Sequence, residues 1–250
     1  MENLSFPLGP QWAICQTQAM KQTILMIVAL ALAGCASAPK IEVASNSDEA
    51  KAAIEREIER VEKIIIKDSM ITDLKPFEGL TTLKYINLQR NHITDLTPLT
   101  NLKNLKTLIL EQNRVTDLTP LAGLTELENL QLENNKITDL TPLACLTGLT
   151  QLNLINNNVT DLKPLEGLKG LRELELHGNL ITDLSPLAGL TGLTELILHD
   201  NQITGEQLKY LAGLKQLKEL SLSHNSTLTK AKIAELQKAL PRCKIRHDFE

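Results

Sequence analysis

A spacing of 22 residues between like residues runs through most of this chain and constrains its fold more than any other feature. The spacing is shared by columns of aspartate, asparagine and proline: Asp73, Asp95, Asp117, Asp139, Asp161 and Asp183; Asn91, Asn113, Asn135, Asn157, Asn179 and Asn201; Pro76, Pro98, Pro120, Pro142, Pro164 and Pro186. A period of about 20 to 29 residues is typical of a solenoid, in which each unit packs only against its neighbours. The spacing therefore predicts one elongated domain, with repeats over residues 64–226.

The repeating unit reads L-x-x-L-x-x-L-x-L-x-x-N-x-[IV]-T-D-L-x-P-L-x-x. It resembles the leucine-rich repeat, and its T-D-L-x-P-L segment is similar to the 22-residue class of the internalins. The resemblance implies an α/β fold: a right-handed horseshoe with a parallel β-sheet on its concave face. It also implies short 3₁₀ turns on the convex face and a helical cap at the N-terminal end.

Each unit is expected to contribute one short strand to the sheet. Successive side chains of a strand face opposite ways, so alternate apolar residues point to the core and the residues beside them point outward. The expected inward pairs are Ile64/Ile66, Ile86/Leu88, Leu108/Leu110, Leu130/Leu132, Leu152/Leu154, Leu174/Leu176, Leu196/Leu198 and Leu220/Leu222. The asparagine column can satisfy backbone groups after each strand, and the aspartate and proline columns suit the start of a helical turn.

The N-terminal region has the layout of a bacterial secretory signal. Residues 20–40 read MKQTILMIVALALAGCASAPK, a positive start followed by an apolar run too short to span a bilayer. The segment L-A-G-C before and at Cys35 is similar to a lipobox, which implies cleavage there and a lipid on Cys35. An ordinary signal peptide with an incidental cysteine is the alternative. Residues 1–34 form this signal region, and because 1–19 hold no lysine or arginine, we expect translation to start at Met20.

Two caps are expected to close the solenoid, after a flexible tether over residues 35–46. Residues 47–63 read as an amphipathic helix that covers the first repeat. Near the other end, TGEQLKYLAGLK is longer than its sister segments and suggests a true α-helix. Residues 227–250 then form the C-terminal cap, with a helix that buries Ile233, Leu236 and Leu240 and ends at Pro241, and a final strand in CKIRHDF.

The cysteines within the repeats and the C-terminal cap are not expected to form a disulfide. Cys145 and Cys243 are separated by four to five solenoid turns of about 4.8 Å each, beyond the roughly 7 Å that a disulfide allows between Cα atoms. Both are interpreted as small buried apolar residues.

Composition and motifs argue against several functions. The net charge of −4 and the pI of about 5.8 offer no basic stripe for nucleic acid. The sequence holds no nucleophile elbow, zinc-protease helix, phosphate loop or C-x-x-C pair. We therefore expect a protein that is not an enzyme, carries no cofactor and binds no nucleic acid.

The variable residues beside the inward pairs are the candidates for function. They lie on the expected concave face, which is basic near its N-terminal end, amide-rich in the middle and acidic with histidines in its C-terminal third. A curved parallel sheet of this kind suits a protein or peptide partner. The candidates are Tyr85, Asn87, Gln89, Arg90, Glu111, Gln131, Glu133, Asn153, Glu173, Glu175, His177, Glu195, His199, Asp200 and Glu219.

Several alternatives remain open for this face. It could be the solvated surface of a structural spacer, or it could bind a glycan. His177 and His199 occupy one column in adjacent repeats, so with Glu175, Asp200 or His224 they could hold a divalent metal. Exposed histidines on a polar sheet are usually solvated, and we expect no metal there. The contact residues of the internalins do not map onto this chain, so their partners are not inferred.

Together these features predict a monomeric bacterial envelope lipoprotein, anchored to the membrane through Cys35, whose concave face binds a protein or peptide. Ala36 follows the lipidated cysteine, which resembles the outer-membrane sorting rule if the source is Gram-negative.

Overall fold

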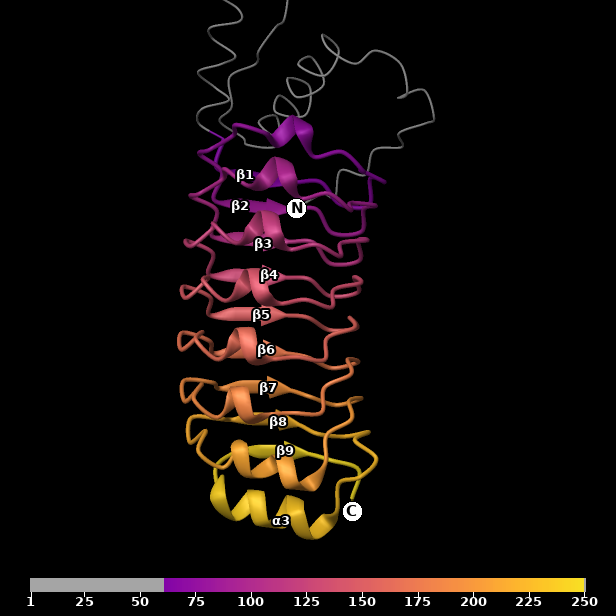
Figure 1. The fold of residues 1–250 in the computed structure, drawn as a ribbon, viewed down its shortest axis with the longest axis vertical. Coiled ribbons are helices and arrows are strands. Elements are labelled where there is room, and N and C mark those ends of the chain that lie inside the picture. Colours follow the sequence, from indigo (N-terminus) through magenta and orange to yellow (C-terminus); the bar gives the residue numbers. More distant parts are fainter. Residues whose placement is uncertain (1–60, 250) are drawn as a thin grey trace, which may run out of the picture.

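The computed structural model describes residues 61–249, which form one solenoid built on a nine-stranded parallel sheet. The strands are paired in chain order from β1 to β9 and stack along the long axis, with α3 at the end opposite β1 (Figure 1). The predicted signal region 1–34, the tether 35–46 and all but the last residues of the helix 47–63 lie outside the described residues. The predicted leucine-rich-repeat fold class is confirmed.

Each repeat contributes a strand of three residues. The strands are β1 Lys63–Ile65, β2 Tyr85–Asn87, β3 Thr107–Ile109, β4 Asn129–Gln131, β5 Gln151–Asn153, β6 Glu173–Glu175, β7 Glu195–Ile197, β8 Glu219–Ser221 and β9 Lys244–Arg246. Lys63 begins β1, so the predicted cap helix does not extend to residue 63. Equivalent residues pair directly, as Leu108 does with Leu130, so the repeat period is also the register of the sheet.

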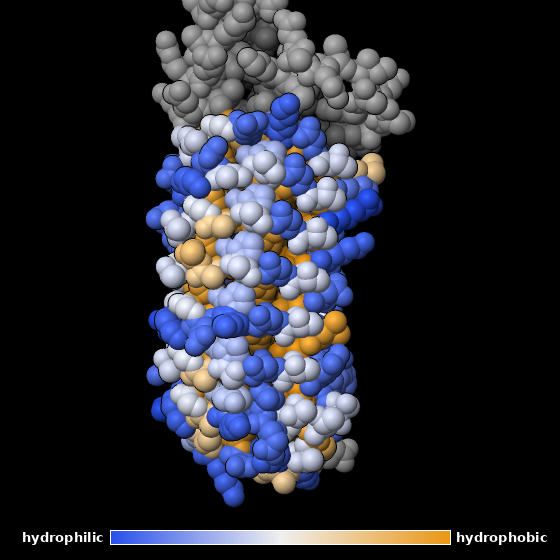
Figure 2. Space-filling view, in the orientation of Figure 1, coloured by the Kyte–Doolittle hydropathy of each residue, from blue (hydrophilic) through white to orange (hydrophobic). Residues whose placement is uncertain are grey.

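The predicted inward residues form the core. Fifteen of the sixteen paired side chains are buried, whereas Ile66, next to the N-terminal end, is half-buried. Leucines from the loops and turns fill the space behind the sheet, so the core is aliphatic along the whole described length. Because the apolar side chains are packed inside, polar and neutral side chains run in columns on the face shown in Figure 2. Apolar ones appear there mainly in the gaps between the columns.

Short 3₁₀ helices turn the chain on the convex side, as predicted. They are η1 Lys75–Phe77, η2 Thr97–Leu99, η3 Thr119–Leu121, η4 Thr141–Leu143, η5 Lys163–Leu165, η6 Ser185–Leu187 and η7 Gly205–Tyr210. In η1 to η6 a proline occupies one of the first two helical positions. The column aspartate accepts a hydrogen bond from the first backbone N–H of the turn, as Asp139 Oδ1 does from Thr141 N at 2.8 Å.

The prediction of an α-helix in TGEQLKYLAGLK is wrong, because η7 is a six-residue 3₁₀ helix. Its hydrogen bonds join residues three apart, such as Gln207 N to Thr204 O and Leu211 N to Leu208 O, both at 3.0 Å. A 3₁₀ helix rises about 2.0 Å per residue against 1.5 Å for an α-helix. The tighter coil therefore spans the convex side with fewer residues while Leu208 and Leu211 stay in the core.

The predicted C-terminal cap is present as α3 Lys230–Ala239 followed by β9. Thr229 caps the N-terminal end of the helix, because its side chain accepts a hydrogen bond from Lys232 N. Ile233, Leu236, Leu240 and Cys243 are buried against the last repeat. The helix therefore shields the end of the core from water.

The two described cysteines are free, as predicted, but only one of them is buried. Burial raises the pKa of the Cys243 thiol to about 11. Cys145 is exposed, so its interpretation as a buried apolar residue is wrong. It occupies the loop position that Gly123 and Gly189 fill in sister repeats, where the backbone lies at the surface. None of the helices between residues 61 and 249 has the length and apolar character that crossing a membrane requires.

Candidate functional site

The candidate residues of neighbouring repeats come together on the concave face because the strands are in register. Glu173 of β6 pairs with Glu195 of β7, which pairs with Glu219 of β8. Tyr85 lies at the other end, where the Lys63 ammonium sits 4.5 Å from the centre of its ring. The candidates therefore form a continuous strip along the sheet rather than one compact pocket.

Two candidates, Asn87 and Asn153, are largely covered by their neighbours. Their side chains are only 4% and 6% exposed, respectively. The Oδ1 atom of Asn87 accepts a hydrogen bond from Gln89 N at 3.1 Å, and that of Asn153 accepts one from Ile155 N at 2.9 Å. Both amides thus hold the backbone at the end of a strand and offer little surface to a partner.

A chain of side-chain hydrogen bonds links the amide-rich middle of the concave face across repeats. Gln131 Nε2 donates to Asn129 Oδ1 at 2.7 Å, and Asn129 Nδ2 donates to Gln151 Oε1 at 2.5 Å. Gln151 Nε2 continues the chain to Glu173 Oε2 at 2.6 Å. Gln89 likewise donates to Glu111 in the next repeat. Sequence reasoning missed this ladder, although Asn129, Gln151 and Glu173 stand one repeat apart in a single column.

Beyond that ladder, the concave face is acidic and partly desolvated. We call Glu173, Glu175, Glu195 and Glu219 the acidic strip. Burial, followed by repulsion from Glu195 and other glutamates, raises the pKa of Glu175. Burial and the neighbouring Glu219 and Glu173 likewise raise the pKa of Glu195, against the opposing charge of Arg246. The Arg246 guanidinium forms an ion pair with Glu219 at 2.5 Å. It therefore offsets negative charge at the C-terminal end of the strip.

The residue that follows the third concave position adopts a left-handed backbone in every repeat. At Arg90, Gln112, Asn134, Asn156, Asp200 and His224 the φ angle lies between 51° and 56°, and at Gly178 it is 66°. The sequence pattern did not reveal this conformation, because such different residues fill the column; Gly178, the asparagines and Asp200 are the types that adopt it most readily. The turn bends the chain toward the buried asparagine and leaves the side chains of Asp200 and His224 at the edge of the concave face.

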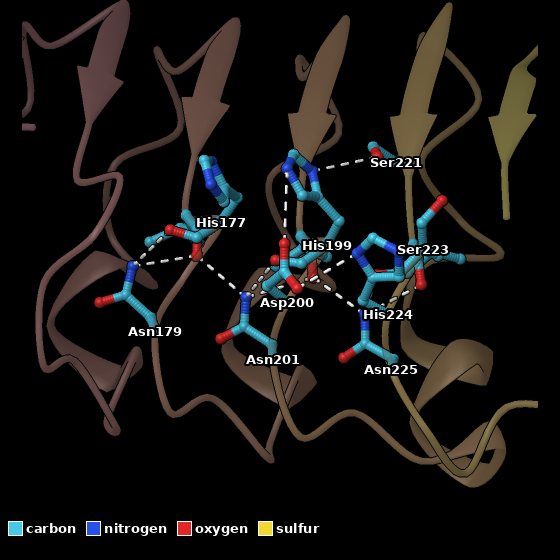
Figure 3. A network of polar contacts seen from close by, with 12 residues as sticks. His177, Asn179, His199, Asp200, Asn201, Ser221, Ser223, His224 and Asn225 are labelled. Carbon is cyan, nitrogen blue, oxygen red and sulfur yellow. Dashed lines mark hydrogen bonds and ion pairs between the residues drawn. The ribbon is translucent and has the colours of Figure 1, made fainter. Parts of the chain in front are cut away.

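The histidines of the C-terminal third form a cluster at this edge. The rings of His177 and His199 stack with their centres 4.0 Å apart and their planes 15° apart. Asp200 Oδ2 lies 3.9 Å from His199 Nε2, and Asp200 Oδ1 lies 3.2 Å from His224 Nδ1. Figure 3 shows the two stacked rings on adjacent repeats, with Asp200 between His199 and His224. Burial and the adjacent His177 lower the pKa of His199, which favours its neutral form.

The comparisons with known proteins agree with the repeat architecture. The family described as Leucine Rich repeats (2 copies) matches residues 103–145, 147–189 and 191–237. None of the curated proteins compared matches the chain.

Solved structures with the same fold include two internalins of Listeria monocytogenes. Internalin C2 is 29% identical with a TM-score of 0.75, and the alignment covers 90% of this chain and 92% of that one. Internalin F is 27% identical with a TM-score of 0.62, over 91% of this chain and 76% of that one. The plant peptide hormone receptor RGFR1, solved in complex with RGF2, is 27% identical with a TM-score of 0.58, over 68% of this chain and 30% of that one. The chain therefore belongs to the leucine-rich repeat family and is internalin-like within it.

Proposed function

We propose that this chain is a non-enzymatic binding protein whose concave face holds an extended, basic segment of a protein or peptide partner. The observation that carries the proposal is the acidic strip, in which Glu173, Glu195 and Glu219 stand in register on adjacent strands with Glu175 beside them. The leucine-rich-repeat fold supports binding as the general function, since solenoid sheets present extended surfaces to macromolecules.

The charge arrangement supports a cationic partner. Burial, followed by repulsion from neighbouring glutamates, raises the pKa of Glu175, so its ionised form is disfavoured in the free protein. A lysine or arginine from a partner would replace that repulsion with charge-assisted hydrogen bonds. The free energy that the fold loses by grouping these carboxylates is therefore recovered when such a partner binds.

The neighbouring structures support the mode of binding without naming the partner. The receptor RGFR1 was solved in complex with RGF2, so a related solenoid holds a peptide. On the concave face of this chain, Tyr85 and Arg90 are of the types enriched at binding hot spots and lie far from the acidic strip, whereas Arg246 at the end of the strip is paired with Glu219. Charge rather than aromatic anchoring is thus the expected basis of recognition at the strip.

The binding proposal is tested by comparing charge reversals on the two faces of the solenoid. Glu173→Lys places a cation in the acidic strip, whereas Glu166→Lys places one on the exposed convex side as a matched control. Proteins retained from envelope extracts by immobilised wild type should also be retained by Glu166→Lys and lost with Glu173→Lys. Identical retention by all three chains would place the binding surface outside the acidic strip, and no retention above an empty matrix would favour a structural spacer.

We also propose that the chain is a bacterial lipoprotein anchored in the cell envelope through Cys35, in the outer membrane where the source is Gram-negative. The support is the charged start, the apolar run and the L-A-G-C segment of residues 20–35. Labelling cells with palmitate should mark wild type and Cys145→Ser, which removes an exposed thiol of the repeats, but not Cys35→Ser. Equal labelling of Cys35→Ser would refute the anchor.

A further inference from the structure

We propose that His177, His199 and Asp200 form a binding site for a divalent transition metal ion such as zinc at the edge of the concave face. One ligand atom from each of these side chains lies within 4.8 Å of the others. Two imidazoles and one carboxylate are a ligand set that zinc favours. The site is independent of the peptide partner proposed above, because it needs only residues of this chain.

The ligand atoms of the three side chains lie somewhat farther apart than they would around a bound zinc ion. Zinc lies about 2.0–2.2 Å from nitrogen and oxygen ligands, so ligand atoms around it are roughly 3.3 Å apart in a tetrahedron. The ligand atoms of His177, His199 and Asp200 lie within 4.8 Å of one another, and Asp200 Oδ2 is 3.9 Å from His199 Nε2. Binding therefore requires the half-buried His177 ring, which is stacked on His199, and the exposed Asp200 carboxylate to rotate toward a shared ion.

The partners of these side chains orient them as the outer shell of a metal site does. Ser221 Oγ, on a buried residue, lies 3.2 Å from His199 Nδ1. When Nδ1 carries the proton and donates it to Ser221, the lone pair of Nε2 is left free on the side of Asp200. His224 lies at the other oxygen of Asp200, and Figure 3 shows both supporting contacts around the central pair. Such contacts fix the tautomer and orientation of metal ligands.

The arrangement differs from that of a solvated histidine pair. A solvated pair needs neither a buried hydroxyl at one ring nor a carboxylate held between two imidazoles. Three protein ligands leave coordination positions open to solvent, where water would complete the sphere.

Calorimetric titration with zinc chloride tests the site on the full chain prepared without a polyhistidine tag. We expect one ion per chain at this site. His199→Gln and Asp200→Asn should each weaken binding at least about tenfold, and Ser221→Ala should weaken it about 10- to 100-fold, as is usual for outer-shell contacts. His92→Gln changes a histidine of a distant repeat and should leave the affinity unchanged.

If the His177→Gln/His199→Gln double variant bound zinc with the same affinity as wild type, the proposal would be overturned, because the ion would then lie elsewhere on the chain. An equal effect of His92→Gln would overturn it as well. A second measurement does not depend on the folding of any variant: cobalt(II) added to wild type should give visible d–d absorption bands of nitrogen and oxygen coordination that zinc abolishes. A spectrum identical to that of cobalt in buffer would reject the site.

Discussion

At the scale of single residues, the asparagine column joins the repeats to one another. Asn157 Nδ2 donates to Leu154 O of its own repeat and to Leu132 O of the preceding one, at 3.1 and 3.0 Å. Its Oδ1 accepts from Ile137 N at 3.0 Å. A single amide thus satisfies buried backbone groups of two repeats, which apolar side chains cannot do.

Replacing one of these amides is expected to destabilise the solenoid strongly. Asn157→Ala leaves a buried N–H and carbonyl groups without their partner, so the free energy of unfolding should fall by at least about 2 kcal/mol. Urea unfolding followed by circular dichroism measures the loss. Asn158→Ala, at the exposed neighbouring position, should change the value by less than about 0.5 kcal/mol. Equal effects of the two variants would contradict a stabilising role for the buried asparagine column.

The sequence predicts the buried residues of this scaffold well, because a fixed period places each leucine and asparagine in the same environment. It predicts the outward residues less well. Asn87 is buried by local hydrogen bonding to Gln89, and Cys145 is exposed because its loop lies at the surface. Such details depend on the packing of particular neighbours, which the period does not encode.

At the scale of one element, β6 carries a carboxyl group whose ionised form its surroundings disfavour. Glu175 lies on this strand among other glutamates, and burial and their charges raise the pKa of its carboxyl. The folded chain therefore binds this proton more tightly than the unfolded chain does. At a pH above its raised pKa, the carboxyl of Glu175 is ionised and lowers the free energy of unfolding. This loss disappears as the pH falls below about 4.3, the pKa of glutamate in the unfolded chain, because the carboxyl is then protonated in both states.

Glu175→Gln should therefore stabilise the chain in a pH-dependent way. The neutral amide removes the repulsion, so the thermal midpoint should rise at pH 7, and the gain should shrink as the pH approaches 4. Melting curves of wild type and variant across this range measure the effect. Glu166→Gln, on the exposed convex side, serves as the matched control and should give no comparable pH-dependent gain. A gain for Glu175→Gln that is constant with pH would contradict the charge explanation.

The elements themselves were predictable where the period holds and less so where it breaks. The strands and the six short turns follow from the leucine, aspartate and proline columns. The lengthened segment at η7 has Gly205 in place of the column aspartate and contains no proline, so the local sequence no longer distinguishes α-helical from 3₁₀ geometry. Contact with α3 and the spacing of the leucine core decide it instead.

At the scale of the whole molecule, each repeat contacts only its neighbours, so stability is local. The pairing order from β1 to β9 contains no crossover between distant strands. In such a molecule, damage to one end should fray that end before it affects the rest. The cap α3 buries Ile233 and Leu236 on the last repeat and is the natural place to test this.

Leu236→Ala should remove a buried side chain of the cap and lower local stability by about 2–5 kcal/mol. Hydrogen exchange followed by mass spectrometry should show lost protection in α3, η7, β8 and β9, with β2 to β4 unchanged. Lys238→Ala changes an exposed residue of the same helix and is the control. Uniform loss of protection over the sheet would mean that the solenoid unfolds as one cooperative unit.

The most direct test of the proposed function is selection of a random peptide library on immobilised wild type. Peptides are counter-selected on a variant with Glu173→Lys and Glu195→Lys, and the convex variant Glu166→Lys serves as the control. We expect enriched peptides rich in lysine and arginine that bind wild type and Glu166→Lys alike, weaken as salt rises and fail to bind the double variant. Enriched peptides without basic residues, or peptides that bind the double variant as tightly as wild type, would contradict the acidic strip as the binding surface.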